Sequence, residues 1–371
     1  MSVLGHQHDK LDREAGVDLL RAAAILMVVA YHVIQMSPHS LPGAMQLARF
    51  GQYGVDLFFV LSGWLIGGLY WKERSRFGDV ELGRFWWRRW LRTIPPYLAV
   101  LPIAWLSVWV ARKEPFNWGY LVFLQNYYAE VPFYVVSWSL CIEEHFYLFM
   151  PLLLLVTLRL GKILRLGNIP VNGLFLLLVG FAPAGRWWLS LDGLDPRFGR
   201  EWTATHLRME GLLIGFWLAW ALASHPGLWA RLLRAAPALA AGGAAVFAWS
   251  ELSGPVQVYR IGLTALAVLW AGLLLLMVSG RCPRVASSPW VKAVALSSYS
   301  VYLTHSLMIH LARLIMEKAP GLHWLAYFPL SLMVVAAGGA FFYFFVERSS
   351  IRLRDRWVPR RISVTAAPTS Q

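Results

Sequence analysis

The chain is organised as long runs of apolar residues separated by short polar connections. Each run is about 17–20 residues long, which is the length a helix needs to cross the hydrocarbon layer of a bilayer. Trp and Tyr gather at the ends of the runs, as in the interfacial belts of membrane proteins. We therefore predict an all-α, polytopic membrane helix bundle. Its spans are expected at residues 17–35, 54–71, 95–111, 138–158, 172–190, 204–222, 235–250, 260–279, 295–313 and 324–346, about ten in all.

Composition supports this prediction, because 58% of the 371 residues are hydrophobic and only 15% are charged. Soluble chains carry about 25% charged residues. The net charge of +14 is unevenly distributed: the connections on the side of the N-terminus hold 23 Lys and Arg, and those on the opposite side hold 9. By the positive-inside rule, both termini are cytoplasmic. The basic composition thus reflects topology and contact with membrane lipids, and it does not indicate a nucleic-acid partner.

No soluble catalytic domain is recognisable. We expect a single transmembrane domain over residues 1–350, followed by a cytoplasmic basic tail over residues 351–371. The chain contains no zinc-spaced CxxC, no HExxH, no Walker loop and no GxSxG elbow, so no metal is expected. Any chemistry must therefore lie inside the bundle.

Ionisable residues within the first predicted span are candidates for function, because charges inside a membrane are costly. Arg21 and His32 are eleven residues apart, which is about three helical turns, so they share one face about 16 Å apart along the axis. Asp18 precedes Arg21 by three residues and can hold its guanidinium. Taken singly, His32 could be an interfacial histidine and Arg21 a snorkelling anchor.

Acidic residues mark two further spans near the side where His32 lies. Asp56 begins the second span, and Glu143 and Glu144 enter the fourth. Adjacent residues point about 100° apart on a helix, so the two glutamates are expected to have different partners. One of them could polarise a histidine or bind an acceptor hydroxyl.

Three other ionisable residues have structural readings that are as plausible as functional ones. Arg208 and Glu210 lie in the sixth predicted span, where an ion pair that holds helices together would explain them. His305, in the ninth span, fits a packed, hydrogen-bonded histidine.

The connection at 72–94 ends in a cluster of arginines, Arg88, Arg89 and Arg92. Retention on the cytoplasmic side alone would require cations there. However, Arg89 and Arg92 are three residues apart at a helix entry, so they point to one side and could clamp phosphates. On the other side, the aromatic and polar connection 112–137 is long enough to form an interfacial cap or an acceptor cleft.

These segments together resemble the acyltransferase-3 family of integral-membrane O-acyltransferases. The resemblance rests on the Arg21–His32 spacing, GVDLFFVLSG from Gly54, the RxxR of Arg89 and Arg92, and SWSLCIEEHFYLFMP from Ser137. RMEGLLIG at 208–215 and SYSVYLTHSLMI at 298–309 are also similar to family segments. The similar segments extend from about residue 12 to 347, in the family's order.

The resemblance implies an enzyme that transfers acetyl or another short acyl group from acyl-CoA to a hydroxyl of an extracytoplasmic carbohydrate or glycolipid. It implies acetyl-CoA or another acyl-CoA as co-substrate and a bacterial inner membrane as the location. Arg21, His32, Arg89 and Arg92 match the family's functional motifs, and Glu143 or Glu144 its acidic position. Glu210 stands where the family often has Asp. Some relatives carry a fused esterase-like domain that is not recognisable here, so a separate periplasmic partner could complete the transfer.

The expected mechanism places the CoA phosphates on Arg89 and Arg92, with Arg88 and Arg21 nearby, and the pantetheine arm along the first helix. His32 would act as general base on the acceptor hydroxyl or, as the less favoured route, accept the acyl group itself. Glu143 or Glu144 would orient the imidazole, and Asp56 completes the catalytic candidates. Two alternatives stay open: a secondary transporter that uses the same charged residues, and a non-catalytic scaffold in which they serve as interhelical polar contacts.

Overall fold

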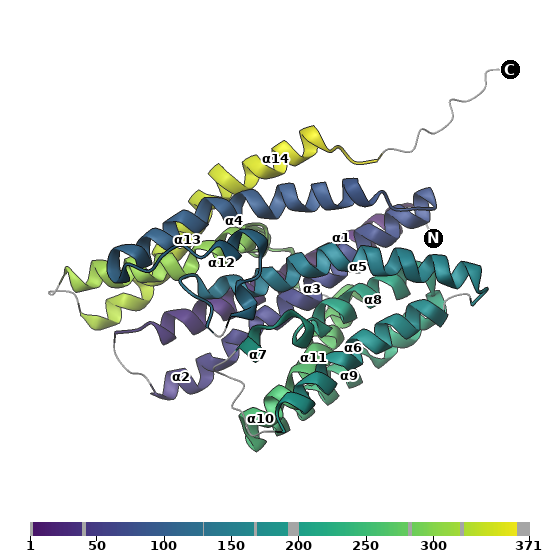
Figure 1. The fold of residues 1–371 in the computed structure, drawn as a ribbon, viewed down its shortest axis with the longest axis horizontal. Coiled ribbons are helices and arrows are strands. Elements are labelled where there is room, and N and C mark those ends of the chain that lie inside the picture. Colours follow the sequence, from purple (N-terminus) through teal and green to yellow (C-terminus); the bar gives the residue numbers. More distant parts are fainter. Residues whose placement is uncertain are drawn as a thin grey trace.

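The computed structural model of the chain describes residues 3–38, 42–128, 130–166, 169–191, 200–280, 284–319 and 323–361. Within these ranges the protein is a bundle of helices with no strand, so the predicted all-α fold is confirmed. Figure 1 shows the long helices running side by side along the long axis of the molecule. Short helices and turns lie at the two ends.

Each of the ten predicted spans overlaps a helix of at least 15 residues. These helices are α1 (Val3–Gln35), α3 (Gly54–Phe77), α4 (Leu82–Arg112), α5 (Trp138–Ile163), α6 (Ile169–Leu189), α8 (Glu210–Ser224), α9 (Pro226–Ser253), α11 (Leu263–Val278), α12 (Pro289–Glu317) and α13 (Tyr327–Phe342). Among the described residues, seven helices are both long and apolar enough to cross a membrane. The count of ten spans and the cytoplasmic placement of the termini therefore stay predictions.

Shorter elements connect the long helices. They are α2 (Pro42–Ala48), η1 (Arg49–Tyr53), η2 (Trp118–Val122), η3 (Gln125–Tyr127), η4 (Val135–Ser137), α7 (Arg200–Thr203), η6 (Thr205–Leu207), α10 (Pro255–Gln257), η7 (Val258–Gly262), η8 (Arg284–Ser287), η9 (Trp324–Ala326), η10 (Tyr343–Glu347) and α14 (Arg348–Trp357). Of these, η7 and η10 are π-helical turns that run directly into their neighbouring helices.

The centre of the bundle is the close packing of α3 on α8, which glycines permit. A Cβ at Gly63 would meet the backbone carbonyl of Leu212, and a Cβ at Gly215 would meet that of Val60. Two membrane helices approach this closely only where one of them lacks a side chain. At 15 residues, α8 is about 22 Å long, and it is enclosed by α3, α6, α9 and α11. This packing fixes the α3 residues that face the functional site.

At one end of the bundle, the residues after α13 turn back onto α4. Arg88 on α4 pairs with Asp355 on α14 at 3.0 Å, and Arg361 pairs with Asp79 at 3.1 Å. Figure 1 shows α14 alongside α4 and the start of α1 toward the same end of the bundle. The predicted domain boundary at residue 350 falls inside α14, while residues 362–371 of the predicted tail lie outside the described residues. The connection 72–94 and the C-terminal segment thus lie on the same side of the bundle, as the distribution of Lys and Arg predicted.

The connection 112–137 forms a cap whose polar groups face inward. Gln125 donates to Tyr97 Oη at 3.2 Å, and Asn126 donates to Thr205 Oγ1 at 2.9 Å. Tyr134 donates to the backbone carbonyl of Leu303 at 2.5 Å. The side-chain amide nitrogens of Gln125 and Asn126 are thus satisfied, while their amide oxygens have no partner among the described residues. These hydrogen bonds hold the connection over the end of the bundle. It accordingly fits the expected cap better than the expected acceptor cleft.

Candidate functional site

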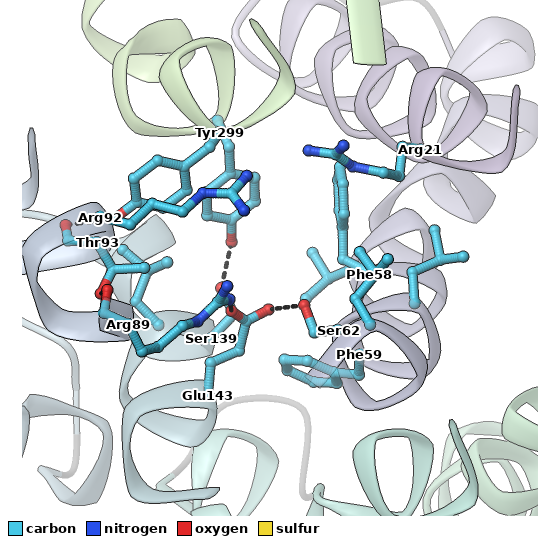
Figure 2. A pocket seen from close by; sticks show the side chains of 15 residues that line it. Arg21, Phe58, Phe59, Ser62, Arg89, Arg92, Thr93, Ser139, Glu143 and Tyr299 are labelled. Atoms are coloured by element: carbon cyan, nitrogen blue, oxygen red, sulfur yellow. Dashed lines mark hydrogen bonds and ion pairs between the residues drawn. The ribbon is translucent and has the colours of Figure 1, made fainter. Parts of the chain in front are cut away.

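A cavity of about 80 Å³ lies between α1, α3, α4, α5 and α12. Three arginines and one carboxylate enter its lining: Arg21 from α1, Arg89 and Arg92 from α4, and Glu143 from α5. Figure 2 shows these side chains converging on the same space from separate helices. We refer to it below as the arginine cavity. The structure thus brings together residues that are up to 122 positions apart in the sequence.

Arg89 is held in the cavity by a short chain of hydrogen bonds. Its Nη2 donates to Tyr147 Oη at 2.5 Å, and Tyr147 donates to Glu143 Oε2 at 2.6 Å. The other oxygen of Glu143 accepts from Ser62 Oγ at 2.9 Å, drawn as a dashed line in Figure 2. Arg89 Cζ also lies 4.2 Å from the centroid of the Tyr147 ring, a cation–π arrangement. The guanidinium is therefore fixed before any ligand binds.

Arg21 and Arg92 are less fully engaged. Arg21 Nη2 donates to Ser298 Oγ at 3.1 Å, and Nη1 lies 3.8 Å from Asp18, the partner that the sequence predicted. Arg92 makes no side-chain hydrogen bond or ion pair with any residue the structure describes. Its donors are thus free for a ligand, and guanidinium groups bind phosphates and carboxylates in bidentate fashion.

The two adjacent glutamates have different partners, as their separation on the helix predicted. Glu143 faces the cavity, whereas Glu144 accepts from Thr93 Oγ1 at 2.7 Å. Glu144 Oε2 is buried and has no hydrogen-bond partner among the described residues. Only Glu143 therefore reaches the arginine cavity.

His32 does not line this cavity. Its Nδ1 lies 2.8 Å from the carbonyl oxygen of Val28, which can only accept, so Nδ1 carries the proton and Nε2 has a free lone pair. The ring lies edge-on to His305, with 4.8 Å between the centroids. Neither Glu143 nor Glu144 contacts His32, so the structure does not support the expectation that a carboxylate orients this imidazole. The backbone of α1 orients it instead.

This neighbour, His305, was predicted to be a packed, hydrogen-bonded histidine. It is fully buried, its Nδ1 donates to the carbonyl oxygen of Tyr302 at 2.7 Å, and its Nε2 has no partner within the described ranges. The Tyr302 ring is 5.6 Å from the His305 ring and lines the arginine cavity. The histidine pair therefore lies directly beside this cavity.

Asp56, predicted as catalytic, is engaged elsewhere. Arg208 Nη2 donates to its Oδ1 at 2.9 Å, and both side chains are buried. Arg208 lies just before α8, not inside a span as predicted, because the chain turns there to reach Asp56 and to donate to the Trp202 carbonyl at 3.2 Å. Glu210 pairs with Arg186 at 2.5 Å. The ion-pair reading of this region fits the structure, with partners on other helices.

Arg88, predicted to bind the donor with its neighbours, points away from the cavity. It donates to the carbonyl oxygen of Val358 and pairs with Asp355 on α14. Since Arg88 and Arg89 are adjacent, only one of them can face inward. Its role in this structure is to anchor the C-terminal segment to α4.

Sequence reasoning missed the hydroxyl groups that complete the cavity. Ser62, Ser139, Tyr299 and Tyr302 line it, and Tyr147 bridges Arg89 and Glu143. Tyr147 was detectable, because it follows Glu143 by four residues and so lies on the same face of α5. The others carry no charge that would mark them in an apolar helix. Among the described residues, no group of three or more His, Cys, Asp or Glu could hold a metal ion.

These features define an integral membrane protein whose helices enclose polar, ionisable side chains next to a histidine pair. A family model described as "Acyltransferase domain" matches residues 14–344. The chain belongs to this acyltransferase-3 family, as the resemblance in the sequence indicated.

Curated relatives carry O-acetyltransferase names. The chain is 30% identical over 224 residues to "Peptidoglycan O-acetyltransferase OatA" of Listeria monocytogenes. The aligned region covers 55% of this chain and 33% of the relative. It is 28% identical over 221 residues to "O-acetyltransferase OatA" of Staphylococcus aureus, covering 55% of this chain and 34% of the relative. The matches thus span about a third of the length of these relatives. No solved structure matches the chain significantly.

Proposed function

We propose that the protein is a membrane O-acyltransferase that uses cytoplasmic acyl-CoA, with acetyl as the default acyl group, to acylate a hydroxyl of an extracytoplasmic carbohydrate. The observation that carries the proposal is the position of the histidine pair, which touches the lining of the arginine cavity through Tyr302. Membership of an acyltransferase family and the names of the relatives support the reaction class. A bacterial inner membrane is the matching location.

In this proposal the arginine cavity holds the phosphorylated donor. Arg92 and Arg21 supply free or partly free guanidinium donors, and Arg89 is fixed by Tyr147 and Glu143. The cavity of about 80 Å³ holds only part of such a donor, so the thin pantetheine arm would have to enter between the helices. Only this arm would then cross toward His32, which avoids moving phosphate charge through the bilayer.

His32 is the general base in this mechanism. Its Nε2 lone pair takes the proton of the acceptor hydroxyl while the hydroxyl oxygen attacks the thioester carbon. The C–S bond breaks, the ester forms, and CoA leaves as a thiolate that takes up a proton. His305 lies beside the His32 ring, with 4.8 Å between the centroids, and its Nε2 has no partner among the described residues, so its lone pair is available next to the protonated His32. No carboxylate is required for this step.

The test is acyl-CoA consumption by the purified protein in nanodiscs, with cell-envelope extract as the acceptor source. We expect free CoA thiol to appear in step with acylated envelope material, and only when extract is supplied. Acylation of the protein itself in the absence of extract would indicate the acyl-histidine route. If acyl-CoA is neither bound nor consumed, the enzyme proposal is wrong. Substrate uptake by proteoliposomes without acyl-CoA would then support the transporter.

A further inference from the structure

A second cavity of about 290 Å³ is lined by Tyr31, the residue before His32. Besides Tyr31 of α1, its lining comes from three connections that are far apart in the sequence: η1, α7, and the turn from α9 into α10 and η7. The charge count assigns all three to the side opposite the N-terminus. We call this cavity the aromatic cleft. It is lined by Tyr31, Arg49, Gln52, Tyr53, Trp202, Glu251, Pro255 and Val258.

The aromatic cleft is connected to the histidine pair by ring contacts. The Tyr31 ring, which lines the cleft, lies 4.9 Å from the His32 ring in an edge-on arrangement. His32 contacts His305, and His305 contacts Tyr302 in the lining of the arginine cavity. Ring contacts through the two imidazoles therefore connect the linings of the two cavities. A molecule in the aromatic cleft would be close to the base that the proposed reaction requires.

The polar groups of the cleft are arranged for hydroxyl ligands. Glu251 accepts from Tyr53 Oη at 2.7 Å and pairs with Arg49 at 3.2 Å. A carboxylate has about four lone-pair sites, so it retains capacity for further O–H donors. The Gln52 side-chain amide, which can both donate and accept, makes no hydrogen bond with the residues described. Because Glu251 is already paired with Arg49, the site favours neutral ligands over anions.

The aromatic part of the cleft is held rigidly. Arg208 Cζ lies 4.9 Å from the Trp202 ring, and the Tyr259 ring is stacked on Trp202 with 6.3 Å between centroids. Arg208 is itself fixed by Asp56. A ring that is fixed in advance costs little entropy when a ligand stacks on it. Asp56 thus positions the cleft through Arg208, although it touches neither cavity.

We infer that the aromatic cleft binds one sugar ring of the carbohydrate acceptor. The apolar C–H groups of a pyranose would pack against the part of the Trp202 ring that lines the cleft, and its hydroxyls would bond to Glu251, Gln52 and Arg49. The volume lies near the lower end of ligand pockets, which are roughly 300–1,000 Å³, so the cleft admits a single ring of a longer chain. This inference rests on the proposed function and names the acceptor subsite within it.

The test is direct binding of two soluble probes, a tetramer of N-acetylglucosamine and a tetramer of glucose, measured by calorimetry on the full chain in phosphatidylcholine nanodiscs. We expect wild type to bind at least one tetramer. Trp202→Ala and Glu251→Gln should each weaken that binding at least tenfold, and Trp202→Phe should recover most of it. Glu251→Gln keeps an oxygen that accepts from Tyr53, so it tests the charge with little risk to folding.

The matched control is Trp249→Ala, which removes a 52% exposed tryptophan on α9 outside the cleft. It should bind the probe as wild type does. If neither tetramer binds, or if the cleft variants and the control behave alike, the inference is wrong. Acyl-CoA binding measured on the same samples distinguishes the acceptor-site inference from the proposed function. If wild type binds acyl-CoA but neither glycan, the acceptor-site inference is wrong while the proposed donor stands. If wild type binds a glycan but no acyl-CoA, the acceptor-site inference stands while the proposed donor is wrong.

Discussion

The bundle contains two groups of charged side chains, one buried and one partly buried, that look alike in the sequence and differ in the structure. In the first, the paired group, each carboxylate meets its own arginine: Asp56 with Arg208 and Glu210 with Arg186. In the second, the open group, Arg21, Arg89 and Arg92 face a cavity together with Glu143. A closed buried pair satisfies its own charges and leaves nothing for a ligand. A charged residue inside a membrane helix is therefore a candidate for function. Whether it belongs to the scaffold or to the site depends on whether a partner on another helix already neutralises it.

The largest effect is expected where the paired group is broken. Arg208→Met leaves Asp56 buried without a counter-charge, which should lower the free energy of unfolding by about 3–5 kcal/mol. Thermal unfolding in detergent would measure it. Combining Arg208→Met with Asp56→Leu should restore most of the stability, because no charge is then left unpaired. If Arg208→Met alone is as stable as wild type, the Asp56–Arg208 pair does not stabilise the fold, and the distinction between the paired and the open group is wrong.

A catalytic effect without a stability effect is expected at the histidine pair. His32→Ala removes the general base and should reduce kcat by about 10²–10⁴-fold, measured as acyl-CoA consumption with envelope extract. His310→Ala on α12, an exposed histidine, is the control and should leave the rate unchanged. Undiminished turnover by His32→Ala would exclude His32 as the base.

An effect on donor binding is expected in the open group. Arg92→Met should weaken CoA binding by about 1.5–3 kcal/mol, the value of a hydrogen bond to a charged group, which is roughly 10- to 150-fold. The control is Arg88→Met on the same helix, since Arg88 contacts α14 instead of the cavity. Calorimetry with CoA would measure both. Equal losses would mean that Arg88 also binds the donor.

The smallest effect is expected at Tyr147. Tyr147→Phe keeps the ring that lies under Arg89 but removes the hydroxyl between Arg89 and Glu143. A net loss of about 0.5–1.5 kcal/mol in CoA binding is expected. A change as large as that of Arg92→Met would indicate that Tyr147 itself touches the donor.

Much of this could be predicted from the sequence, because it depends on local pattern. The helices follow from the length of the apolar runs, and the different partners of Glu143 and Glu144 follow from helix geometry. The Asp18–Arg21 pair follows from their spacing. The expected carboxylate beside His32 and the grouping of Arg88 with its neighbours did not hold, because both depend on which helix packs against which.

Hydropathy and charge determined by themselves that this protein is a helical membrane bundle, since burial in lipid constrains each helix independently of the others. The ordered motifs also identified the family, which the comparison confirmed. Only the tertiary structure decided which charges are paired and which face a cavity, and that ring contacts link His32 to the linings of two cavities. Those properties belong to contacts between helices, such as α6 with α8 in the paired group and α1, α4 and α5 around the arginine cavity, and no single helix encodes them.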